Sequence, residues 1–461
     1  MRKIRSKSAL LVALLAFAVP VAGQAFPSDD EIQEILDGRV AAGGAVGIAV
    51  GLLEADGSTR FLSSGSAGEG AAPPASGTLF EIGSITKVFT GTLLAEMAGR
   101  GEVALDDPIQ GYLPDGVTAP TRGGREITLT DLATHRSALP RLPLNMAPAD
   151  MSDPYVDYTE EQLYAFLSSY ELPRDIGAEG EYSNLGAGLL GHLLSRHLGL
   201  SYEDAVRERI LAPLGMSMTG IELTPRMAEA MALGHDPGGD VVPLWNVAVL
   251  SGAGGLRSNV DDMLRFMAAN VGEPQSDLER ALREAHRPRT DLGPMQIGLN
   301  WITRNTDGQR TVWHNGGTAG FRTFAGFDPD AGTAVVVLTN SGIGADDIGF
   351  HLLNPSSELV TPPVPAYLHR EAVELEPAVL ERYVGAYELA PQMIATFEIA
   401  DGRLRTRLTN QPSVYAYAAS ETVFFLRAVA AEIEFEIDEA GEVQAMILRQ
   451  GGQTLRGARV R

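Results

Sequence analysis

The sequence predicts a mixed α and β region followed by a small antiparallel β-domain. From residue 26 to about residue 355, apolar segments at helical spacing alternate with short β-rich runs such as Val46–Leu53 and Ala334–Thr339. A cluster of prolines between residues 355 and 365 then interrupts this pattern and predicts a linker. From residue 377 onward, one short helical segment precedes several strand-like runs. The 461 residues are too many for one ordinary domain, so the division also fits the length.

The first 25 residues have the pattern of a secretory signal peptide. Basic residues at positions 2, 3, 5 and 7 precede a short apolar core, Ala9–Ala18, and small residues at 23–25 form a cleavage site. Pro20 interrupts the apolar run before it is long enough to span a bilayer comfortably, although an uncleaved anchor is the alternative. We therefore expect an exported protein, periplasmic or secreted, without a membrane span once the signal is removed.

Three further regions are expected after this leader: a main domain at 26–355, a proline-rich linker at 356–376 and a β-domain at 377–461. Glu432–Asp438 alternates strictly between acidic and apolar residues, so one face of that strand is apolar. Turn signals at Asp401-Gly402, at 410–412 and at Gly451-Gly452 separate several such strands. The pattern predicts a barrel or a strongly curved antiparallel sheet.

Composition excludes several classes of function. The formal net charge of −23 would repel a polyanion at long range, so nucleic acid is not expected to be the main partner. The chain has no cysteine, which excludes a disulfide framework, a thiolate metal site and a cysteine nucleophile. No metal or organic cofactor is implied by any motif.

Lysine is rare in this chain, and its placement is informative. Only three of the 36 basic residues are lysines, and Lys3 and Lys7 lie in the predicted leader. The mature chain would therefore contain Lys87 alone. Lysine can lose its proton when it is desolvated, whereas arginine cannot, so a single lysine among arginines indicates chemistry or is an accident of composition.

Ser84-Ile85-Thr86-Lys87 opens a predicted helix that ends near Gly99 and Gly101. Residues three apart share a helix face, so the Ser84 hydroxyl and the Lys87 amine would be neighbours. The positive potential of the helix N-terminus would stabilise an alkoxide and disfavour a protonated amine. A capping serine beside a surface lysine is the alternative interpretation.

Two later segments carry candidate polar groups. In Tyr182-Ser183-Asn184, before an apolar helical run, the phenol could carry protons to a leaving group and the amide could hold a substrate carbonyl. In Trp313–Phe321, glycines would let the backbone approach a ligand and aim an N–H into an oxyanion hole, beside His314. Taken singly, each segment fits a capped or glycine-rich surface turn better.

Together, in this order, the segments resemble the class C β-lactamase superfamily of serine hydrolases. That group also contains low-molecular-weight penicillin-binding proteins, D-aminopeptidases and carboxylesterases. The resemblance covers most of residues 30–350, and the tail from Leu380 is similar to a C-terminal β-domain fused to many members. The segments that carry it are Phe80–Lys87, Ile127–Leu139, Gly252–Ser258 with Asp261-Asp262-Met263, and Leu380–Tyr387.

The resemblance implies a fold and a set of roles. The fold is α+β, an antiparallel sheet flanked by helices with a helical subdomain, the active site lying between them, followed by the barrel-like domain. Ser84 would be the nucleophile, Lys87 its base and Tyr182 the proton carrier. Asn184 would bind the acyl-side amide, and the backbone N–H groups of Ser84 and Gly317 would form the oxyanion hole.

One departure bears on the substrate. Where many such β-lactamases carry Lys-Thr-Gly, this chain has His314-Asn315-Gly316, also expected to bind substrate. Histidine is mostly neutral at pH 7 and cannot meet a β-lactam carboxylate as lysine does, unless Arg322 supplies the charge. We expect a small-molecule or short-peptide acyl substrate: a β-lactam or D-amino-acid amide, or alternatively a short-chain ester.

Other interpretations of the sequence were also weighed. A penicillin- or cell-wall-peptide-binding protein without turnover is a further alternative, distinguished by the absence of Ser84-dependent product release. No Gly-x-Ser-x-Gly occurs, so the α/β-hydrolase nucleophile elbow is absent. His135 is expected to be structural. The C-terminal domain would either cover the cleft and set acyl-chain length or drive dimerisation, and the sequence leaves the oligomeric state open.

Overall fold

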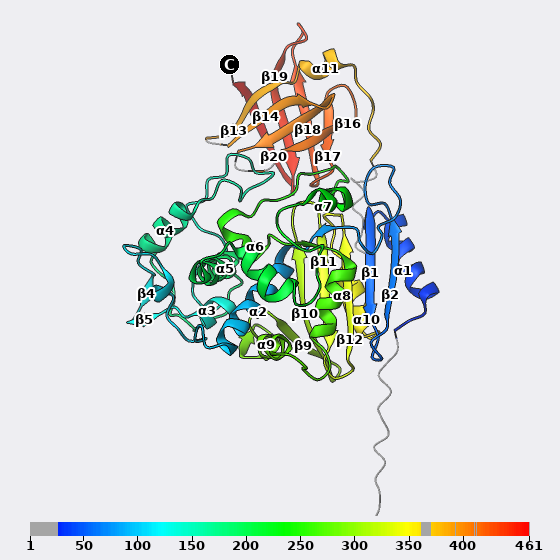
Figure 1. Ribbon diagram of the computed structural model, residues 1–461. Helices are drawn as coiled ribbons and strands as arrows, with labels where there is room; N and C mark the ends of the chain where they lie inside the picture. The colour runs from blue at the N-terminus through cyan, green and yellow to red at the C-terminus, as the bar shows by residue number, and fades with distance from the viewer. Residues whose placement is uncertain (1–25, 361–369, 392, 410, 412, 461) are drawn as a thin grey trace, which may run out of the picture.

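The computed structural model describes residues 26–360, 370–391, 393–409, 411 and 413–460. The predicted leader at 1–25 and the centre of the predicted linker at 361–369 lie outside the described residues. Figure 1 shows a large domain built on a sheet with surrounding helices, and a barrel above it. The expected order, a mixed α and β region followed by a β-domain, is confirmed.

The first domain is built on one antiparallel sheet. Its eight strands, in spatial order, are β2 (Thr59–Gly65), β1 (Gly47–Leu53), β12 (Thr333–Thr339), β11 (Arg322–Asp328), β10 (Gln309–Gly317), β9 (Ile302–Thr306), β8 (Met295–Ile297) and β7 (Thr290–Leu292). Strands from the two ends of the domain's sequence pair near one edge of the sheet, where β1 pairs with β12 and Val50 lies opposite Val337. The two predicted β-rich runs are therefore neighbours in the sheet.

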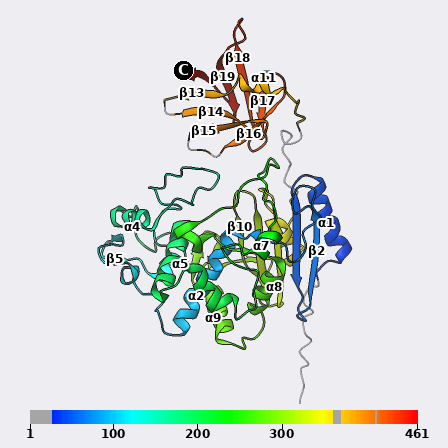
Figure 2. The ribbon, with the colours of Figure 1, turned by 45° about the horizontal axis from the view of Figure 1, so that its top comes forward.

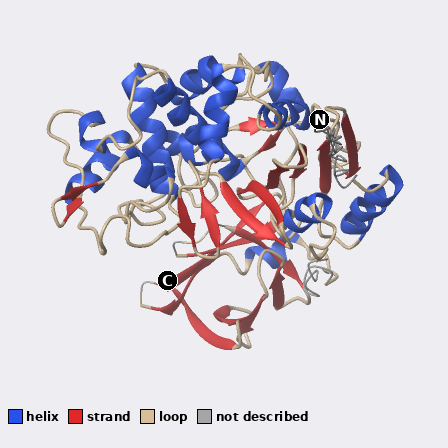
Figure 3. Ribbon diagram, turned by 90° about the horizontal axis from the view of Figure 1, so that it is seen from below, coloured by secondary structure: helices blue, strands red, loops and turns tan. Residues whose placement is uncertain are grey.

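Helices cover both faces of this sheet, as the period-two alternation of its side chains requires. Val335 and Val337 face a core shared with α1 (Asp29–Ala41) and α10 (Asp346–Leu353). Val336 and Leu338 face the larger core, shared with α8 (Val260–Ala269). Figure 3 shows most of the helices gathered on one side of the strands.

The remaining helices extend the larger core beyond the sheet. They are α3 (Leu129–Ala133), α4 (Glu160–Ser169), α5 (Asn184–Leu198), α6 (Tyr202–Val206), α7 (Pro225–Ala230) and α9 (Asp277–His286). Two pairs of two-residue strands belong to this part: β3 (Phe80–Glu81) with β6 (Arg257–Ser258), and β4 (Thr121–Arg122) with β5 (Arg125–Glu126). It also contains the 3-10 helical segments η2 (Ile109–Tyr112) and η4 (Ala248–Ala253). No helix within the described ranges is long and apolar enough to cross a membrane.

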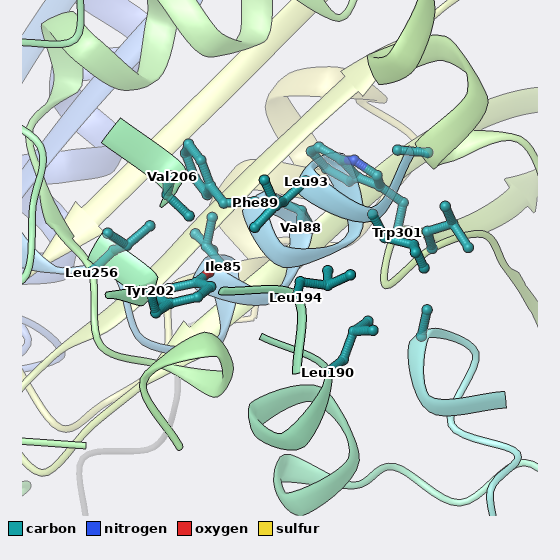
Figure 4. Close-up of a cluster of buried hydrophobic side chains, with 14 of the residues drawn as sticks. Ile85, Val88, Phe89, Leu93, Leu190, Leu194, Tyr202, Val206, Leu256 and Trp301 are labelled. Carbon is teal, nitrogen blue, oxygen red and sulfur yellow. The ribbon is translucent and has the colours of Figure 1, made fainter. Parts of the chain in front are cut away.

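The helix α2 (Thr86–Gly99) runs through the middle of this core, directly after the 3-10 turn η1 (Gly83–Ile85). Every residue from Thr86 to Met97 is buried. Figure 4 shows Val88, Phe89 and Leu93 of α2 among apolar side chains of neighbouring elements, including Leu190 and Leu194 of α5. A Cβ at Gly91 would lie 2.0 Å from the carbonyl oxygen of Leu299, so only glycine permits this close approach. The turn that carries Ser84 is thus fixed to the most buried helix.

The second domain is a closed antiparallel barrel of eight strands, because β13 pairs with β20 as well as with β14. A short helix, α11 (Pro377–Glu381), precedes it. The strands are β13 (Gly385–Ala390), β14 (Met393–Ala400), β15 (Arg403–Leu408), β16 (Val414–Ala418), β17 (Val423–Leu426), β18 (Ala431–Ile437), β19 (Val443–Gln450) and β20 (Gln453–Val460). The predicted alternation holds in β18, where Ile433 and Phe435 are buried and Glu434 pairs with Arg449 on the outside. Turns at 401–402 and 451–452 were predicted, and part of the third, Asn410 and Pro412, lies outside the described residues.

The barrel contacts the first domain through the segment around Asp240. The Asp240 carboxylate lies 3.0 Å from the Arg403 guanidinium of β15 and accepts a hydrogen bond from the Tyr417 hydroxyl of β16. Gly238 lies against the backbone and Cβ of Arg427 in the β17–β18 turn. Figure 2 shows the barrel on the same side of the domain from a second direction.

Candidate active site

The candidate nucleophile lies in a short turn before the central helix. Ser84 is the middle residue of η1, and Lys87 is the second residue of α2. The Lys87 Nζ lies 2.8 Å from the Ser84 Oγ and donates to the carbonyl oxygen of Ala253 at 2.6 Å. The Thr86 hydroxyl accepts from the backbone N–H of Leu256 at 3.1 Å and so ties the 253–256 loop to the same turn. The predicted Ser84–Lys87 neighbourhood is therefore present.

Lys87 is fully buried, which decides its protonation. Its side chain has 0% exposure and no carboxylate partner among its contacts in the described structure. Burial, and after it the charge of Arg141, holds the pKa of Lys87 well below the usual range of lysine. A neutral amine has a free electron pair, so Lys87 can accept the proton of Ser84. The alternative of a surface lysine is wrong.

Tyr182 is brought to the same place by the loop before α5. The Lys87 Nζ lies 4.9 Å from the centre of its ring. Burial raises the pKa of Tyr182 to about 12, although a hydrogen bond with Ser84 and the charge of Arg141 lower it. The phenol is therefore protonated at neutral pH and can donate. Ser183 caps α5, because its hydroxyl accepts a hydrogen bond from the Gly186 N–H at 2.8 Å. The segment is therefore a helix cap and also places Tyr182 beside Lys87.

Two histidines flank this phenol. The ring of His135 lies 4.5 Å from the ring of Tyr182, and that of His314 lies 6.2 Å away. Burial lowers the pKa of His314 to about 3, so its imidazole is neutral. His135, expected to be structural, accepts from the backbone N–H of Ser183 at 3.3 Å and thereby holds the segment that carries Tyr182.

Strand β10 is pressed against the nucleophile turn. A Cβ at Gly316 would lie 1.9 Å from the Ile82 carbonyl oxygen, and the hydroxyl of Thr323 donates to that oxygen at 2.9 Å. On the other side of the contact, Gly83 has a φ of +50°, and a Cβ there would lie 2.6 Å from the Gly317 nitrogen. The glycines therefore place the Gly317 N–H beside Ser84, as an oxyanion hole requires.

A small cavity of about 30 Å³ opens next to Ser84. Asn184, Tyr155, Trp245, Gly317 and Thr318 are among its lining residues. The Asn184 amide donates weakly to the Tyr155 hydroxyl at 3.4 Å, and its Oδ1 has no hydrogen-bond partner among the described residues. That oxygen is available to accept a substrate N–H.

The structure places Asn315 differently from the other predicted residues. Its amide donates to the carboxyl of Asp346 on α10 at 2.5 Å, so its side chain is not directed at Ser84. Arg322, considered as a source of positive charge, donates to the carbonyl oxygens of Thr318 and Phe321 and interacts with Asp346. The Arg322 guanidinium is therefore already bound by protein groups and is not free to pair with a substrate carboxylate.

Arg141 is the cation that sequence reasoning missed. Its guanidinium lies 5.2 Å from the centre of the Tyr182 ring. It is an exposed residue, and within the described ranges its side chain makes no ion pair or hydrogen bond. Its charge acts on Lys87, His135 and Tyr182, lowering the pKa of each. Arg141 lies two residues after the Ile127–Leu139 segment, but its proximity to Tyr182 depends on a loop with no periodic pattern.

Trp245 and Tyr155 were also missed. Their rings lie 5.5 Å apart, and the indole N–H of Trp245 donates to the Ser152 carbonyl at 3.0 Å. No sequence signal singles them out, since both lie in loops. In the described part of the chain, no group of three or more histidine, aspartate or glutamate residues is placed to hold a metal ion.

Comparison with known families and proteins gives a consistent result. Residues 32–350 match the family described as "Beta-lactamase", and residues 369–459 match a domain of unknown function, DUF3471. The D-alanyl-D-alanine-carboxypeptidase/endopeptidase AmpH of Escherichia coli (strain K12) is 30% identical over 342 residues, covering 70% of this chain and 87% of AmpH. Penicillin-binding protein 4* of Bacillus subtilis (strain 168) is 27% identical over 413 residues, covering 83% of this chain and 88% of that protein.

Solved structures agree in fold. The beta-lactamase/D-alanine carboxypeptidase from Pseudomonas syringae has a TM-score of 0.61 at 22% identity, covering 71% of this chain and all of that one. A class C beta-lactamase has a TM-score of 0.63 at 23% identity, covering 73% of this chain and 99% of its own. At this identity the likeness concerns the fold, and it confirms the expected α+β arrangement of sheet, helices and helical subdomain.

Proposed function

The chain belongs to the beta-lactamase family, and on this premise we propose that it is a serine hydrolase acting through an acyl-enzyme on Ser84. The observation that carries the proposal is the contact between Ser84 Oγ and the Lys87 Nζ at 2.8 Å, with the amine fully buried. A buried neutral amine can remove the hydroxyl proton, and the N-terminus of α2 stabilises the oxygen that becomes negative.

Acylation then proceeds in one sequence of bond changes. The Ser84 oxygen attacks the substrate carbonyl carbon while its proton passes to Lys87, and the N–H groups of Ser84 and Gly317 stabilise the oxyanion. The bond to the leaving nitrogen or oxygen breaks as Tyr182 donates its proton to that atom and receives the proton held by Lys87. Water attacks the Ser84 ester by the reverse use of the same groups, releasing the acid and restoring the Ser84 hydroxyl.

The substrate class we favour is a β-lactam or the amide bond of a D-amino-acid peptide. The names of the relatives support it, since AmpH is a D-alanyl-D-alanine carboxypeptidase. A second support is Arg141, an exposed cation whose guanidinium lies 5.2 Å from the ring centre of Tyr182, the proposed proton donor to the leaving group. A leaving group that ends in a carboxylate, such as a C-terminal D-alanine, would pair with this guanidinium. Arg141 would then supply the positive charge for the substrate carboxylate, which the neutral His314 cannot supply.

A carboxylesterase is the second candidate, and the neutrality of His314 favours it. An uncharged short-chain ester needs no cation in the cleft, and the pKa of His314 at about 3 keeps that imidazole uncharged throughout the neutral range. The relative values of kcat/KM for nitrocefin, for a D-alanyl-D-alanine peptide and for p-nitrophenyl acetate distinguish the two candidates.

The test of the proposal is the intact mass of the protein after mixing with benzylpenicillin, with Ser84→Ala as control. We expect an adduct on the wild type alone. Rapid loss of the adduct with consumption of the drug indicates a β-lactamase, and a long-lived adduct with peptide hydrolysis indicates a penicillin-binding peptidase. An adduct without turnover of any acyl substrate would instead indicate the binding protein considered above.

If neither an adduct nor Ser84-dependent hydrolysis of peptides or esters is found, the proposal is wrong. Export is part of the same proposal, because such substrates lie outside the cytoplasm in the cell wall. Fractionation of cells that express the full chain, followed by N-terminal sequencing, tests both export and the cleavage after residue 25.

A further inference from the structure

The interior of the barrel differs between its two ends. At the end beside α11, five aromatic rings fill the interior: Tyr383, Tyr387, Phe397, Phe424 and Phe435. Leu380 of α11 packs onto the same cluster, and Figure 1 places α11 at the end away from the first domain. This end of the barrel is closed by packed side chains.

The end that faces the first domain is hollow. A cavity of about 390 Å³ lies there, in the size range of small-molecule binding sites. Residues of six strands, β14 to β19, form its barrel side, among them Leu408, Leu426, Ile433 and Leu448. The first domain closes the mouth with Met151, Val242, Trp245 and Ala319. The cavity therefore belongs to both domains, and its wall is mostly apolar, with polar side chains such as Thr406, Gln411 and Gln450 among the lining residues.

The cavity provides no positive charge for an anionic ligand. Among its described lining residues there is no lysine or arginine, and the one carboxyl belongs to Asp236. The Asp236 Oδ1 accepts hydrogen bonds from the backbone N–H groups of Gly238 at 2.8 Å and Asp240 at 3.0 Å. This carboxyl therefore stabilises the turn at residues 236–240. An uncharged hydrocarbon group fits this environment best.

Trp245 joins the cavity to the candidate active site, because its side chain lines both the large cavity and the small one beside Ser84. Its backbone is held firmly: the N–H donates to Glu81 at 2.7 Å, and the carbonyl accepts from Arg257 at 2.8 Å. Asn184 also lines the small cavity, whereas Tyr182 and His314 do not. The residue shared with the barrel cavity thus lines the part of the cleft that also holds Asn184, the predicted acyl-binding amide.

We infer that the barrel cavity receives an apolar chain on the acyl half of the substrate, reached past Trp245. This inference rests on the proposed hydrolase function and names its substrate class: an ester or amide whose acyl group carries a linear or aromatic hydrocarbon. It also assigns the C-terminal domain to substrate selection, one of the two roles that the sequence left open.

The experiment is a series of p-nitrophenyl esters from acetate through butyrate and octanoate to decanoate, with Ser84→Ala to show that hydrolysis depends on Ser84. We expect kcat/KM to rise at least tenfold from acetate to the longer acyl groups. Leu448→Trp fills the cavity and should reduce the decanoate-to-acetate ratio of kcat/KM at least tenfold. Ile447→Trp, the next residue on β19 with a side chain on the outer face, is the matched control and should keep the ratio.

A binding measurement separates this inference from the proposed function. A brominated decanoate methyl ester should quench the tryptophan fluorescence of Ser84→Ala, and Ser84→Ala with Trp245→Phe should lose that quenching, since Trp301 and Trp313 are buried elsewhere. Quenching without any ester hydrolysis would overturn the hydrolase proposal and leave the site standing. Two results would overturn the inference. One is Ser84-dependent hydrolysis with a flat chain-length profile and no quenching. The other is an equal loss of the decanoate-to-acetate ratio in Leu448→Trp and in Ile447→Trp.

Discussion

At the scale of single residues, Lys87 is the group on which the chemistry depends. Lys87→Arg replaces the neutral amine with a permanent cation that cannot accept a proton, so we expect acylation of Ser84 to fall by roughly a thousandfold, as for loss of a general base. Labelling with a fluorescent penicillin measures this rate. Because a buried arginine could disturb folding, Lys87→Met, which is apolar and of similar length, should be equally inactive while melting at or above the wild-type temperature. Near-native labelling of either variant would exclude Lys87 as the base.

Arg141 connects substrate charge with pH dependence. The catalytic amine works only when neutral, so kcat/KM falls as pH decreases through the pKa of Lys87, which the Arg141 charge lowers. Arg141→Gln removes that charge, raises the pKa of Lys87 and should move the acid limb of the profile to higher pH. The same variant should raise KM for a D-alanyl-D-alanine peptide roughly tenfold, from loss of a charge-assisted hydrogen bond.

The control for Arg141 is Arg122→Gln, an exposed arginine of β4 that pairs with Asp175. It should leave both the pH profile and KM unchanged. A change in KM for Arg141→Gln without any movement of the acid limb would show that this guanidinium binds substrate but does not act on Lys87.

At the scale of elements, the close contact between β10 and the turn η1 shapes the cleft. Gly316→Ala would drive a Cβ into the Ile82 carbonyl oxygen, so we expect β10 to shift away from Ser84. The expected result is a loss of at least about a hundredfold in kcat, as for one oxyanion-hole donor, with a cost of about 1–3 kcal/mol in unfolding free energy. Gly38→Ala in α1 is the matched control, since nothing lies within 4 Å of the new Cβ; it should retain activity and stabilise the helix. Equal activity of the two variants would contradict the argument.

The elements also show how far a sequence can be interpreted. Ser84 and Lys87 were found because they lie three residues apart at a helix start, where spacing makes them neighbours. Tyr182 and Asn184 were assigned their roles by the family resemblance. The alternation in β18 likewise predicted a barrel-like sheet. Closure of the barrel was not predictable, because β13 pairs with β20 across the whole domain and periodicity carries no information about such a partner.

The functional loop residues could not be predicted either, because their positions depend on long-range contacts that a local sequence pattern does not encode. Trp245 is placed by hydrogen bonds to Glu81 and Arg257, which come from distant parts of the chain. Arg141 reaches Tyr182 because the carbonyl of Arg141 accepts from the Asn184 N–H at 3.0 Å, a contact that no local pattern encodes. The side chain of Asn315 was assigned to the substrate by its motif, but the neighbouring Asp346 binds its amide.

At the scale of the whole molecule, Asp240 fixes the barrel above the cleft. Asp240→Ala leaves Arg403 and Tyr417 without this acceptor, at a cost of about 1–3 kcal/mol to the contact between the domains. We expect calorimetry to resolve two unfolding transitions where the wild type shows one, and the preference for long acyl chains to decrease. Asp330→Ala removes an exposed ion pair with Arg310 inside the first domain and should do neither. A single transition and an unchanged preference in Asp240→Ala would show that other contacts hold the barrel.

The burial of Lys87 also makes the protein unusually suited to chemical labelling. In residues 26–460, Lys87 is the single lysine of the described structure, and its amine has 0% exposure. A bulky amine-directed ester therefore finds no lysine target in these residues until the protein opens around α2. The modification rate reports the free energy of that local opening from one tryptic peptide, in the way that amide hydrogen exchange does for many sites at once. A covalent acyl group on Ser84 should slow the modification of Lys87. A single mass measurement therefore follows both the acylation of Ser84 and the local opening of the cleft.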